Sequence, residues 1–285
     1  MRSYLLAGSY AYDNILIHKG QFHTKILPES LNKLNVSFPI DNVVEELGGT
    51  AGNIAYNASL LQDNPYLVGC MGLDGGKYKS HLESLGLNAD TLTYFDKDNN
   101  AKCWLMTDLE NNQIIGFNSG VLKYRPHVNF NETPKLWHLS ADNPLTTAWL
   151  VKNAIQMNKD YFFDPGQVLP VFIEGITNNI LEFNDIIKYA KGIFLNEYEA
   201  ELLLSYAKKS LNKIIQKDQF IVKTLGSKGV ELITTTENYF VPVAKANEIV
   251  DPTGCGDAFR AGFLNQYIQN KSFKECLEYG TRCHN

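Results

Sequence analysis

The residues with the clearest chemical potential are Gly254, Gly256 and Asp257. Beyond them, Phe259 and Phe263 stand four residues apart, which predicts a helix that begins near the glycines. The first turn of a helix has unpaired N–H groups and the positive end of the dipole, and glycine lets a ligand approach the backbone, so this loop could cradle a phosphate. A carboxylate is unfavourable in a simple anion site. Asp257 therefore makes better sense as a base that takes a proton from a hydroxyl group attacking a phosphoryl group.

The same loop also has a structural interpretation. Aspartate is a good N-cap residue, and glycine-rich turns between strand and helix occur in many α/β proteins that bind nothing there. A lone glycine-rich loop is a weak signal, so the spacing leaves both interpretations open. The decision depends on the rest of the chain.

Composition narrows the class of protein. The chain has 285 residues, of which 44% are hydrophobic and 20% charged, as is ordinary for a globular enzyme. The formal net charge is −5 and no long basic run is present, which argues against nucleic acid as a partner and favours small molecules. The apolar run near the N-terminus is shorter than a signal peptide or a membrane span, so we expect a cytoplasmic protein with no membrane partner.

Cysteines and histidines give no metal-binding pattern. The five cysteines are scattered, without a Cys-x-x-Cys pair, and are interpreted as reduced thiols in or near the core. The six histidines have no ligand spacing either and are interpreted as surface or incidental polar residues. Neither residue type predicts a zinc site.

A second glycine-rich entry into a helix occurs at Gly48-Gly-Thr-Ala-Gly-Asn53. Asn53 lies in the first turns of the predicted helix, where it could cap locally or contact a polar ligand, and both interpretations stay open. Asp13 falls beyond the start of the first predicted strand, as either a turn residue or part of a ligand site. In open α/β sheets, ligands gather at the carboxyl ends of strands.

The second half of the chain alternates between strand and helix. Predicted strands are 136–139, 161–163, 192–195, 219–223 and 230–234, and predicted helices are 146–158, 184–190 and 197–205. This alternation favours an α/β fold with a mostly parallel sheet and crossover helices.

Two β-rich stretches, at about 14–46 and 93–119, interrupt that alternation. The pattern at 34–38 suggests a half-exposed strand, and residues 101–107 and 113–118 flank a predicted hairpin connection. The two stretches could pair into a small sheet that covers the cleft, and phosphoryl transfer needs such a lid to exclude water. Phe117 in this lid could stack on a base or fill the lid core, and the residues do not distinguish the two.

Three further segments follow predicted strands. Asn196-Glu-Tyr-Glu199 has the form of a capping box, and Glu199 could also organise Mg²⁺ through water. The loop 224–229 suits backbone contact with a nucleotide or a tight turn between adjacent strands, and Asp164-Pro-Gly-Gln167 suits a polar ligand or a plain turn.

Together these motifs resemble the ribokinase (PfkB) family of carbohydrate and nucleoside kinases. Gly48-Gly49 followed by Asn53 resembles the first family signature, and Asp251-Pro-Thr-Gly-Cys-Gly-Asp257 resembles the second. Within the family the chain is most similar to bacterial adenosine kinases. The resemblance covers nearly all of residues 1–285 and implies a single kinase domain: a three-layer α/β sandwich with a central, mostly parallel sheet, into which the lid segments are inserted.

The resemblance also implies roles for the acceptor side of the site. Asp13 is expected to hold the ribose hydroxyl groups, with Ser9, Gly49 and Asn53 beside it. The lid residues Ser37 and Phe117 are expected to contact the nucleoside, and Gln167 is expected to lie near the base.

On the donor side, Asp257 is expected to take the proton from the 5′-hydroxyl, while the amides of Gly254, Cys255 and Gly256 neutralise charge on the transferred phosphoryl group. The resemblance implies ATP and Mg²⁺ as cofactors. It implies further roles for the following residues: Asn196, Thr224, Gly226 and Gly229 contact ATP, Glu199 organises Mg²⁺, and Asp251 and Thr253 lie near a monovalent cation such as K⁺.

Two features depart from the resemblance. Cys103, with Trp104 next to it, stands where the bacterial adenosine kinases have a lid aromatic that stacks on the base. The chain also ends at Asn285, before the C-terminal helix and adenine-pocket residues that the family pattern contains. From this we expect either a truncated chain or weakened nucleotide binding.

The sequence thus predicts an ATP-dependent kinase for a primary hydroxyl group, most simply the 5′-hydroxyl of adenosine, giving AMP. A sugar kinase of the ribokinase or fructokinase type is the alternative within the same chemistry. A catalytically silent nucleoside-binding protein is the alternative from another class. A homodimer formed through the lid is also predicted, because β-rich inserts with exposed apolar positions often bind a partner.

Overall fold

The computed structural model describes residues 2–26, 32–110, 112–175, 180–244 and 254–283. Its large sheet contains, in order across the sheet, β14 (Asn238–Val241), β13 (Val230–Ile233), β12 (Phe220–Thr224), β11 (Gly192–Asn196), β10 (Asp160–Phe163), β9 (Leu136–Leu139), β1 (Leu5–Ala7) and β4 (Tyr66–Val68). Neighbouring strands from β12 to β4 are parallel, and β13 and β14 add antiparallel pairs at one edge. The predicted mostly parallel sheet is confirmed.

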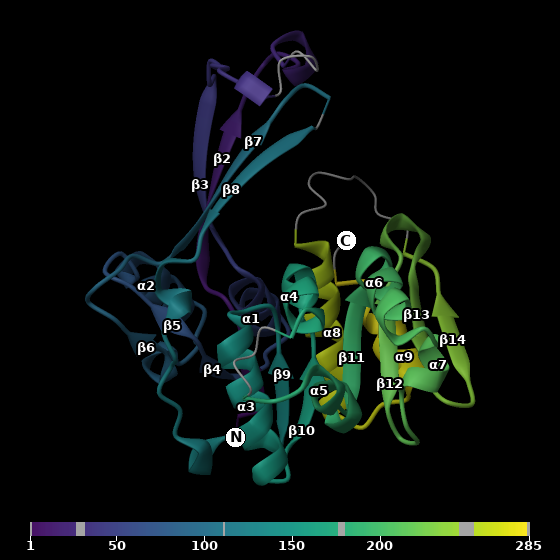
Figure 1. The fold of residues 1–285 in the computed structure, drawn as a ribbon. Helices are drawn as coiled ribbons and strands as arrows, with labels where there is room; N and C mark the ends of the chain where they lie inside the picture. Colours follow the sequence, from purple (N-terminus) through teal and green to yellow (C-terminus); the bar gives the residue numbers. More distant parts are fainter. Residues whose placement is uncertain (1, 27–31, 111, 176–179, 245–253, 284–285) are drawn as a thin grey trace.

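Helices cover both faces of this sheet (Figure 1). One face carries α1 (Thr50–Leu60), α2 (Gly76–Ser84), α8 (Cys255–Ile268) and α9 (Phe273–Gly280). The other carries α3 (Pro144–Gln156), α4 (Leu169–Ile173), α5 (Phe183–Tyr189), α6 (Glu197–Ala207) and α7 (Leu211–Ile214). The described residues therefore form the predicted three-layer sandwich.

The central strands are apolar on both faces, as parallel strands between two helical layers must be. In β10, Phe162 packs in the core on the α8 side, whereas Tyr161 and Phe163 pack in the core on the α3 side. In β11, Phe194 and its neighbours Ile193 and Leu195 divide in the same way. Because the side chains of a strand alternate, each of these short strands contributes to both cores.

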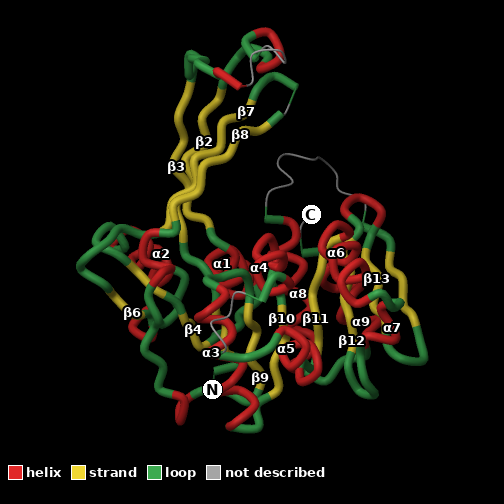
Figure 2. Tube along the Cα trace, viewed as in Figure 1, coloured by secondary structure: helices red, strands yellow, loops and turns green. Residues whose placement is uncertain are grey.

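A separate sheet projects from this body (Figure 2). It contains β3 (Asn42–Gly48), β2 (Ala11–Ile17), β7 (Ala101–Thr107) and β8 (Gln113–Asn118), in that order. This is the small lid sheet predicted from the sequence, and β7 and β8 form the expected hairpin. A two-stranded sheet of β5 (Cys70–Met71) and β6 (Thr93–Tyr94) lies apart from it, although residues 93–94 fell within the predicted lid stretch.

The strand predicted at 34–38 is wrong: residues 34–40 have no regular secondary structure, and the strand of this region is β3. The reason is local packing. The Phe38 ring lies against His18 and Phe22, with ring centroids 5.3 and 4.9 Å apart, so its apolar position reflects an aromatic cluster and not a sheet face.

Two elements at the end of the described chain were missed, β14 and α9. α9 has a sequence signature, because Ser272 and Glu275 form a capping box. Within the described residues, no helix is both long and apolar enough to cross a bilayer.

Candidate active site

A cavity of about 300 Å³ lies where the lid meets the body. Its lining comes from four places: the lid strands, helix α1, the start of helix α8 and the turn that follows α9. The residues are Asp13, Glu46, Leu47, Asn53, Tyr56, Asn57, Gly254, Cys255, Ala258 and Cys283. The two glycine-rich helix starts singled out in the sequence thus reach one cavity, together with Asp13.

Asp257 stands at the third position of α8, whose N-cap is Gly254. Gly254 has φ +79°, a left-handed conformation that favours glycine, and its carbonyl oxygen accepts the first bonds of the helix, from Asp257 N and Ala258 N, both at 2.9 Å. The turn therefore places the carboxylate next to the N–H groups of the helix start. This is the arrangement that a base beside a phosphate cradle requires.

The surroundings of Asp257 suit proton transfer near neutral pH. Burial raises the pKa of Asp257 to about 6, against the lowering effects of the Arg260 charge and of a hydrogen bond from Asn53. Asn53 Nδ2 donates that bond to Asp257 Oδ2 at 2.9 Å. A base whose pKa lies close to the working pH is both deprotonated and able to accept a proton.

Asn53 is held by the start of α1. Gly49, the N-cap residue, has φ +86°, and a Cβ atom on it would lie 2.6 Å from the carbonyl oxygen of Ser9. The Ser9 hydroxyl accepts a hydrogen bond from Thr50 N at 3.1 Å. Ser9 and Gly49 therefore fix the entry into α1, and Asn53, one turn later, reaches across to Asp257.

Asp13 lies on β2 opposite Glu46 on β3, and both line the cavity. Burial and the neighbouring Glu46 charge raise the pKa of Asp13. Two acidic groups at the base of the lid can accept hydrogen bonds from the hydroxyl groups of a ligand.

Strand register extends this pair into a row across the lid. Asp13 pairs with Cys103 of β7, and Cys103 pairs with Phe117 of β8. Directly opposed residues point to the same face of a sheet, so Phe117 shares the face of Asp13. Trp104, one residue after Cys103, points to the opposite face and cannot supply an aromatic ring on the side of Asp13.

Comparisons with known proteins identify the family of the chain. Residues 22–283 match the family described as pfkB family carbohydrate kinase. The chain belongs to this family. It is 30% identical over 258 residues to a nucleoside kinase of Methanocaldococcus jannaschii, covering 90% of this chain and 82% of that protein. A ribose-1-phosphate kinase of Halopiger xanaduensis is 26% identical, covering 83% of this chain and 78% of that protein.

Solved structures of the family resemble the whole chain. A nucleoside kinase of Burkholderia thailandensis, determined in complex with inosine, has a TM-score of 0.86 and 29% identity and covers 98% of this chain and 89% of its own. The Methanocaldococcus jannaschii nucleoside kinase, described as an archaeal member of the ribokinase family, has a TM-score of 0.83 and 28% identity and covers 99% and 89%. The fold is therefore ribokinase-like, and this pfkB family member is a phosphotransferase with a hydroxyl acceptor.

Other predicted site residues of this pfkB family chain lie away from the cavity. Ser37 is exposed, in the loop next to Phe38 at the outer end of the lid. Gln167 is exposed in a short 3₁₀ turn, four residues after the end of β10. Neither lines the cavity, so their expected contacts with a nucleoside stay predictions.

The predicted nucleotide-binding residues gather at the carboxyl ends of β11 and β12. Asn196 and Thr224 are register partners on these strands. Gly226 and Gly229 follow in the connection from β12 to antiparallel β13, which is the tight turn that the sequence left open. A turn at this edge of the sheet is also where a nucleotide would be contacted.

Glu199 forms the capping box of α6 with Asn196. Glu199 N donates to Asn196 Oδ1 at 2.8 Å, and Asn196 N donates to Glu199 Oε2 at 2.8 Å. The Glu199 side chain is buried, and burial raises its pKa. Among the described residues, no cluster of three or more side chains that could hold a metal ion is found. Asp251 and Thr253, expected near a monovalent cation, lie outside the described residues.

Sequence reasoning missed part of the site. His138 was interpreted as surface or incidental, but it is fully buried on β9 and its Nε2 lies 3.1 Å from Asp164 Oδ2. Arg260, one turn after Asp257, was not singled out. The signal in the sequence is its spacing, because a residue three positions after Asp257 lies on the same face of the predicted helix.

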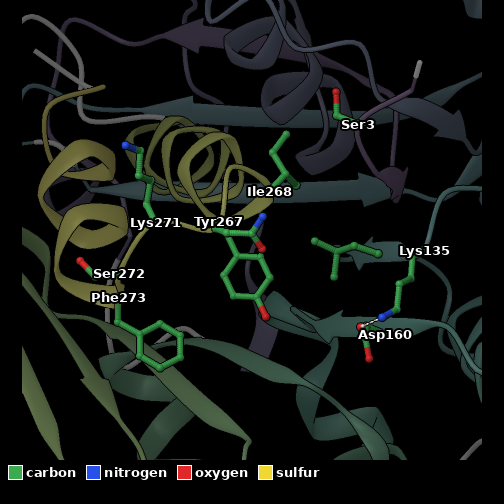
Figure 3. A pocket seen from close by; sticks show the side chains of 10 residues that line it. Ser3, Lys135, Asp160, Tyr267, Ile268, Lys271, Ser272 and Phe273 are labelled. Atoms are coloured by element: carbon green, nitrogen blue, oxygen red, sulfur yellow. Dashed lines mark ion pairs between the residues drawn. The ribbon is translucent and has the colours of Figure 1, made fainter.

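A larger hollow, of about 590 Å³, lies at the far end of α8 (Figure 3). Tyr267 and Ile268 from the end of α8, Phe273 from α9, and Lys135 and Asp160 near the starts of β9 and β10 line it. Since it lies at the amino ends of these strands, and ligands of α/β sheets bind at the carboxyl ends, the smaller cavity is the candidate active site.

Proposed function

We propose that this chain transfers the γ-phosphoryl group of ATP to the 5′-hydroxyl of a nucleoside, with adenosine as the preferred acceptor and AMP as the product. The observation that carries the proposal is the shared cavity. Asp13, Asn53 and the start of α8 line it together, and Asn53 is bonded to Asp257. An acceptor held by Asp13 therefore lies in the same cavity as the helix start beside Asp257.

The reaction needs few parts from the protein. Asp257 takes the proton of the acceptor hydroxyl, and the amides at the start of α8 stabilise negative charge on the transferred group. Asp13 accepts hydrogen bonds from the ribose hydroxyls, with Ser9 and Gly49 shaping the adjoining turn. Positioning and electrostatic stabilisation supply most of the rate enhancement in phosphoryl transfer, which suits this small set.

ATP is proposed to lie over the ends of β11 and β12, where Asn196, Thr224, Gly226 and Gly229 stand. Mg²⁺ would be held on the phosphates and would neutralise their charge, with Glu199 ordering one of its waters. Asp251 and Thr253 are proposed to hold K⁺.

A nucleoside is favoured over a simple sugar by the lid row. Phe117 is 53% exposed on the face of Asp13, so its ring is available to contact a base. Ser37 and Gln167 are proposed to reach the nucleoside from either side. Relatives described as nucleoside kinases and the inosine complex of the Burkholderia thailandensis protein support a purine nucleoside as acceptor.

A substrate panel tests the proposal. ADP release is measured with ATP and Mg²⁺ and, in turn, adenosine, inosine, guanosine, cytidine, ribose, fructose and ribose 1-phosphate, and each product is identified by mass spectrometry. Adenosine is expected to give the highest kcat/KM and AMP as product. Turnover with sugars alone would replace the proposal with a sugar kinase, and no turnover with any acceptor would leave a nucleoside-binding protein.

We also propose that the chain acts in the cytoplasm, where ATP is available, as a homodimer formed through the lid. Ile115 and Phe117 are two residues apart on β8 and therefore lie on the same face of the sheet. They are 57% and 53% exposed. Sedimentation velocity of the wild type and of Ile115→Asp tests this. A dimer that becomes monomeric in the variant supports the lid interface, whereas a wild-type monomer at all concentrations contradicts it.

A further inference from the structure

A buried arginine links the catalytic loop to the end of a neighbouring strand. Arg260 lies one helical turn after Gly256 and is only 9% exposed. Its Nη1 group donates a hydrogen bond to the carbonyl oxygen of Gly256 at 3.0 Å. On the other side of the guanidinium, Nη2 donates to Asp164 Oδ1 at 2.7 Å and Nε donates to Asp164 Oδ2.

Asp164 is a firm anchor for this arginine. It follows β10 directly, and its own N–H donates to the carbonyl oxygen of Leu139 on β9 at 2.9 Å. His138 Nε2, also on β9, donates to Asp164 Oδ2 at 3.1 Å. Although burial raises the pKa of Asp164, the Arg260 charge and the His138 bond outweigh it and hold this pKa at about 2. The carboxylate is therefore ionised and fixed to the sheet.

The contact with Gly256 is the informative one. A buried ion pair is by itself weak evidence for stability, because two apolar side chains can often replace it. Here Nε and Nη2 of the guanidinium donate to Asp164. The remaining nitrogen, Nη1, donates to the carbonyl oxygen of Gly256 in the first turn of α8. That turn carries both the phosphate cradle and Asp257.

The charge of Arg260 also acts on its surroundings. It lowers the pKa of Asp257, and it opposes the effect of burial on the pKa of Glu199. The other groups that affect Asp257 are the Asn53 amide, which stabilises its charged form, and the Asp164 and Asp13 carboxylates, which oppose it. Arg260 is the cation among these groups.

We propose that Arg260 is a positioning residue for phosphoryl transfer: anchored by Asp164, it holds Gly256 and so fixes the first turn of α8 around the transferred group. The inference rests on the proposed function, since it assigns Arg260 to the same reaction. The physical basis is the sensitivity of such reactions to geometry, because a displacement of about 1 Å at the reacting groups costs about 10²-fold in rate.

Two substitutions separate shape from charge. Arg260→Lys keeps the positive charge but cannot bond Gly256 and both oxygens of Asp164 together. Arg260→Gln removes the charge as well. We expect kcat to fall about 10-fold in the first and about 100-fold in the second, with KM for both substrates within about threefold of wild type, because an interaction needed only in the transition state lowers kcat.

Folding must be controlled, because removal of one partner from a buried ion pair strongly destabilises a protein. The double variant Asp164→Asn/Arg260→Gln removes both charges and is expected to recover much of the melting temperature while kcat stays as low as in Arg260→Gln. Phe263→Leu, a buried core change in the same helix, is the matched control. It is expected to lower the melting temperature while kcat per folded molecule stays unchanged.

A readout without turnover completes the test. The carboxyl group of Asp257 is titrated by ¹³C NMR in each variant and assigned with Asp257→Asn. Its midpoint is expected to rise by about one pH unit in Arg260→Gln and to stay in place in Arg260→Lys.

The outcomes separate this inference from the proposed function. If Arg260→Gln keeps wild-type kcat per folded molecule and an unmoved Asp257 midpoint, or if the double variant restores kcat, Arg260 is only a structural residue and the inference is wrong. If the wild type phosphorylates no acceptor, the proposed function fails, and the carboxyl titration still decides whether Arg260 acts on Asp257.

Discussion

The lid and the start of α8 both line the candidate active site, but they are built in different ways. At the helix start, Asn53 of α1 donates a hydrogen bond to Asp257, and Arg260 donates one to the carbonyl oxygen of Gly256. In the lid, β8 is exposed along its whole length and β3 is mostly exposed. The comparison teaches that, under the proposed function, the groups assigned to the chemistry are held by hydrogen bonds to the body, whereas those assigned to recognition lie on a sheet with little packing of its own.

The substitution Asp257→Asn is the strongest test of the difference between the helix start and the lid. If the helix start carries the chemistry, kcat falls about 10²-fold or more, because a general base is lost and the shape of the side chain is kept. ADP release with adenosine measures the effect. Asp160→Asn, a change at the opposite end of β10, is the control and should leave kcat near wild type. Equal rates in all three proteins would remove the proposed base.

The acceptor side is tested by Asp13→Ala. Loss of a charged hydrogen-bond acceptor for the ribose hydroxyls is expected to raise KM for adenosine about 10- to 100-fold, since hydrogen bonds to charged groups contribute about 1.5–3 kcal/mol. KM for ATP should change little. Glu46→Gln, at the paired position on β3, is the matched control and should have a smaller effect. A fall in kcat with unchanged KM would place Asp13 in the chemistry instead.

The pH dependence of kcat/KM tests the role assigned to Asp257 at the start of α8. Because Asp257 must be deprotonated to act, and its pKa is raised to about 6, kcat/KM is expected to fall about tenfold per pH unit below that value. A pH–rate profile of the wild type measures this. A profile that stays flat down to pH 5 would contradict the assignment.

The raised pKa of Asp257 also makes the stability of the fold depend on pH, in the direction opposite to activity. The pKa of Asp257 is higher in the folded than in the unfolded chain, so its stabilising contribution is present at low pH and is lost as pH rises through about 6. Asp257→Asn should therefore gain stability relative to wild type between pH 4 and pH 7. Urea unfolding at both pH values tests this, and a constant difference would show that the carboxyl group is not buried as described.

The smallest effects are expected in the lid. Phe117→Ala should raise KM for adenosine about three- to tenfold, because aromatic contacts are worth about 0.5–1.5 kcal/mol beyond burial. Trp104→Ala changes a ring of similar exposure on the other face of the sheet and should leave KM within twofold. The melting temperatures of both variants should match wild type, since both rings are more than one-third exposed. A larger effect of Trp104 would reverse the assigned faces.

Much of the body was predictable because its signals are local. The runs at 136–139 and 230–234 are apolar and bounded by turn residues, and they became β9 and β13. The capping box of Asn196 and Glu199 was legible for the same reason, since both partners lie within one turn. The strand predicted at 34–38 failed because alternation cannot distinguish a sheet face from the cluster that Phe38 forms with His18 and Phe22.

The family resemblance predicted that Asp13, Asn53 and Asp257 belong to one site, but the individual long-range contacts were not predictable. The bond from Asn53 to Asp257 joins residues 204 positions apart, and that from Arg260 to Asp164 joins residues 96 positions apart. No local pattern encodes such contacts, because they depend on which helices pack on which strands. The role of His138 could not be read for the same reason: its partner is set by the order of β9 and β10 in the sheet.

Glu46, Asp13, Cys103 and Phe117 form a row across the four strands of the lid sheet, and each strand is hydrogen-bonded to the next one in the sheet. Backbone ladders couple neighbouring strands, so Asp13 and Phe117 keep fixed positions relative to each other. Under the proposed function, the ribose hydroxyl groups would meet the first residue and a base the second. A ligand that offers only a ribose or only a base would then make only part of these contacts, so acceptor selectivity would depend on both groups together.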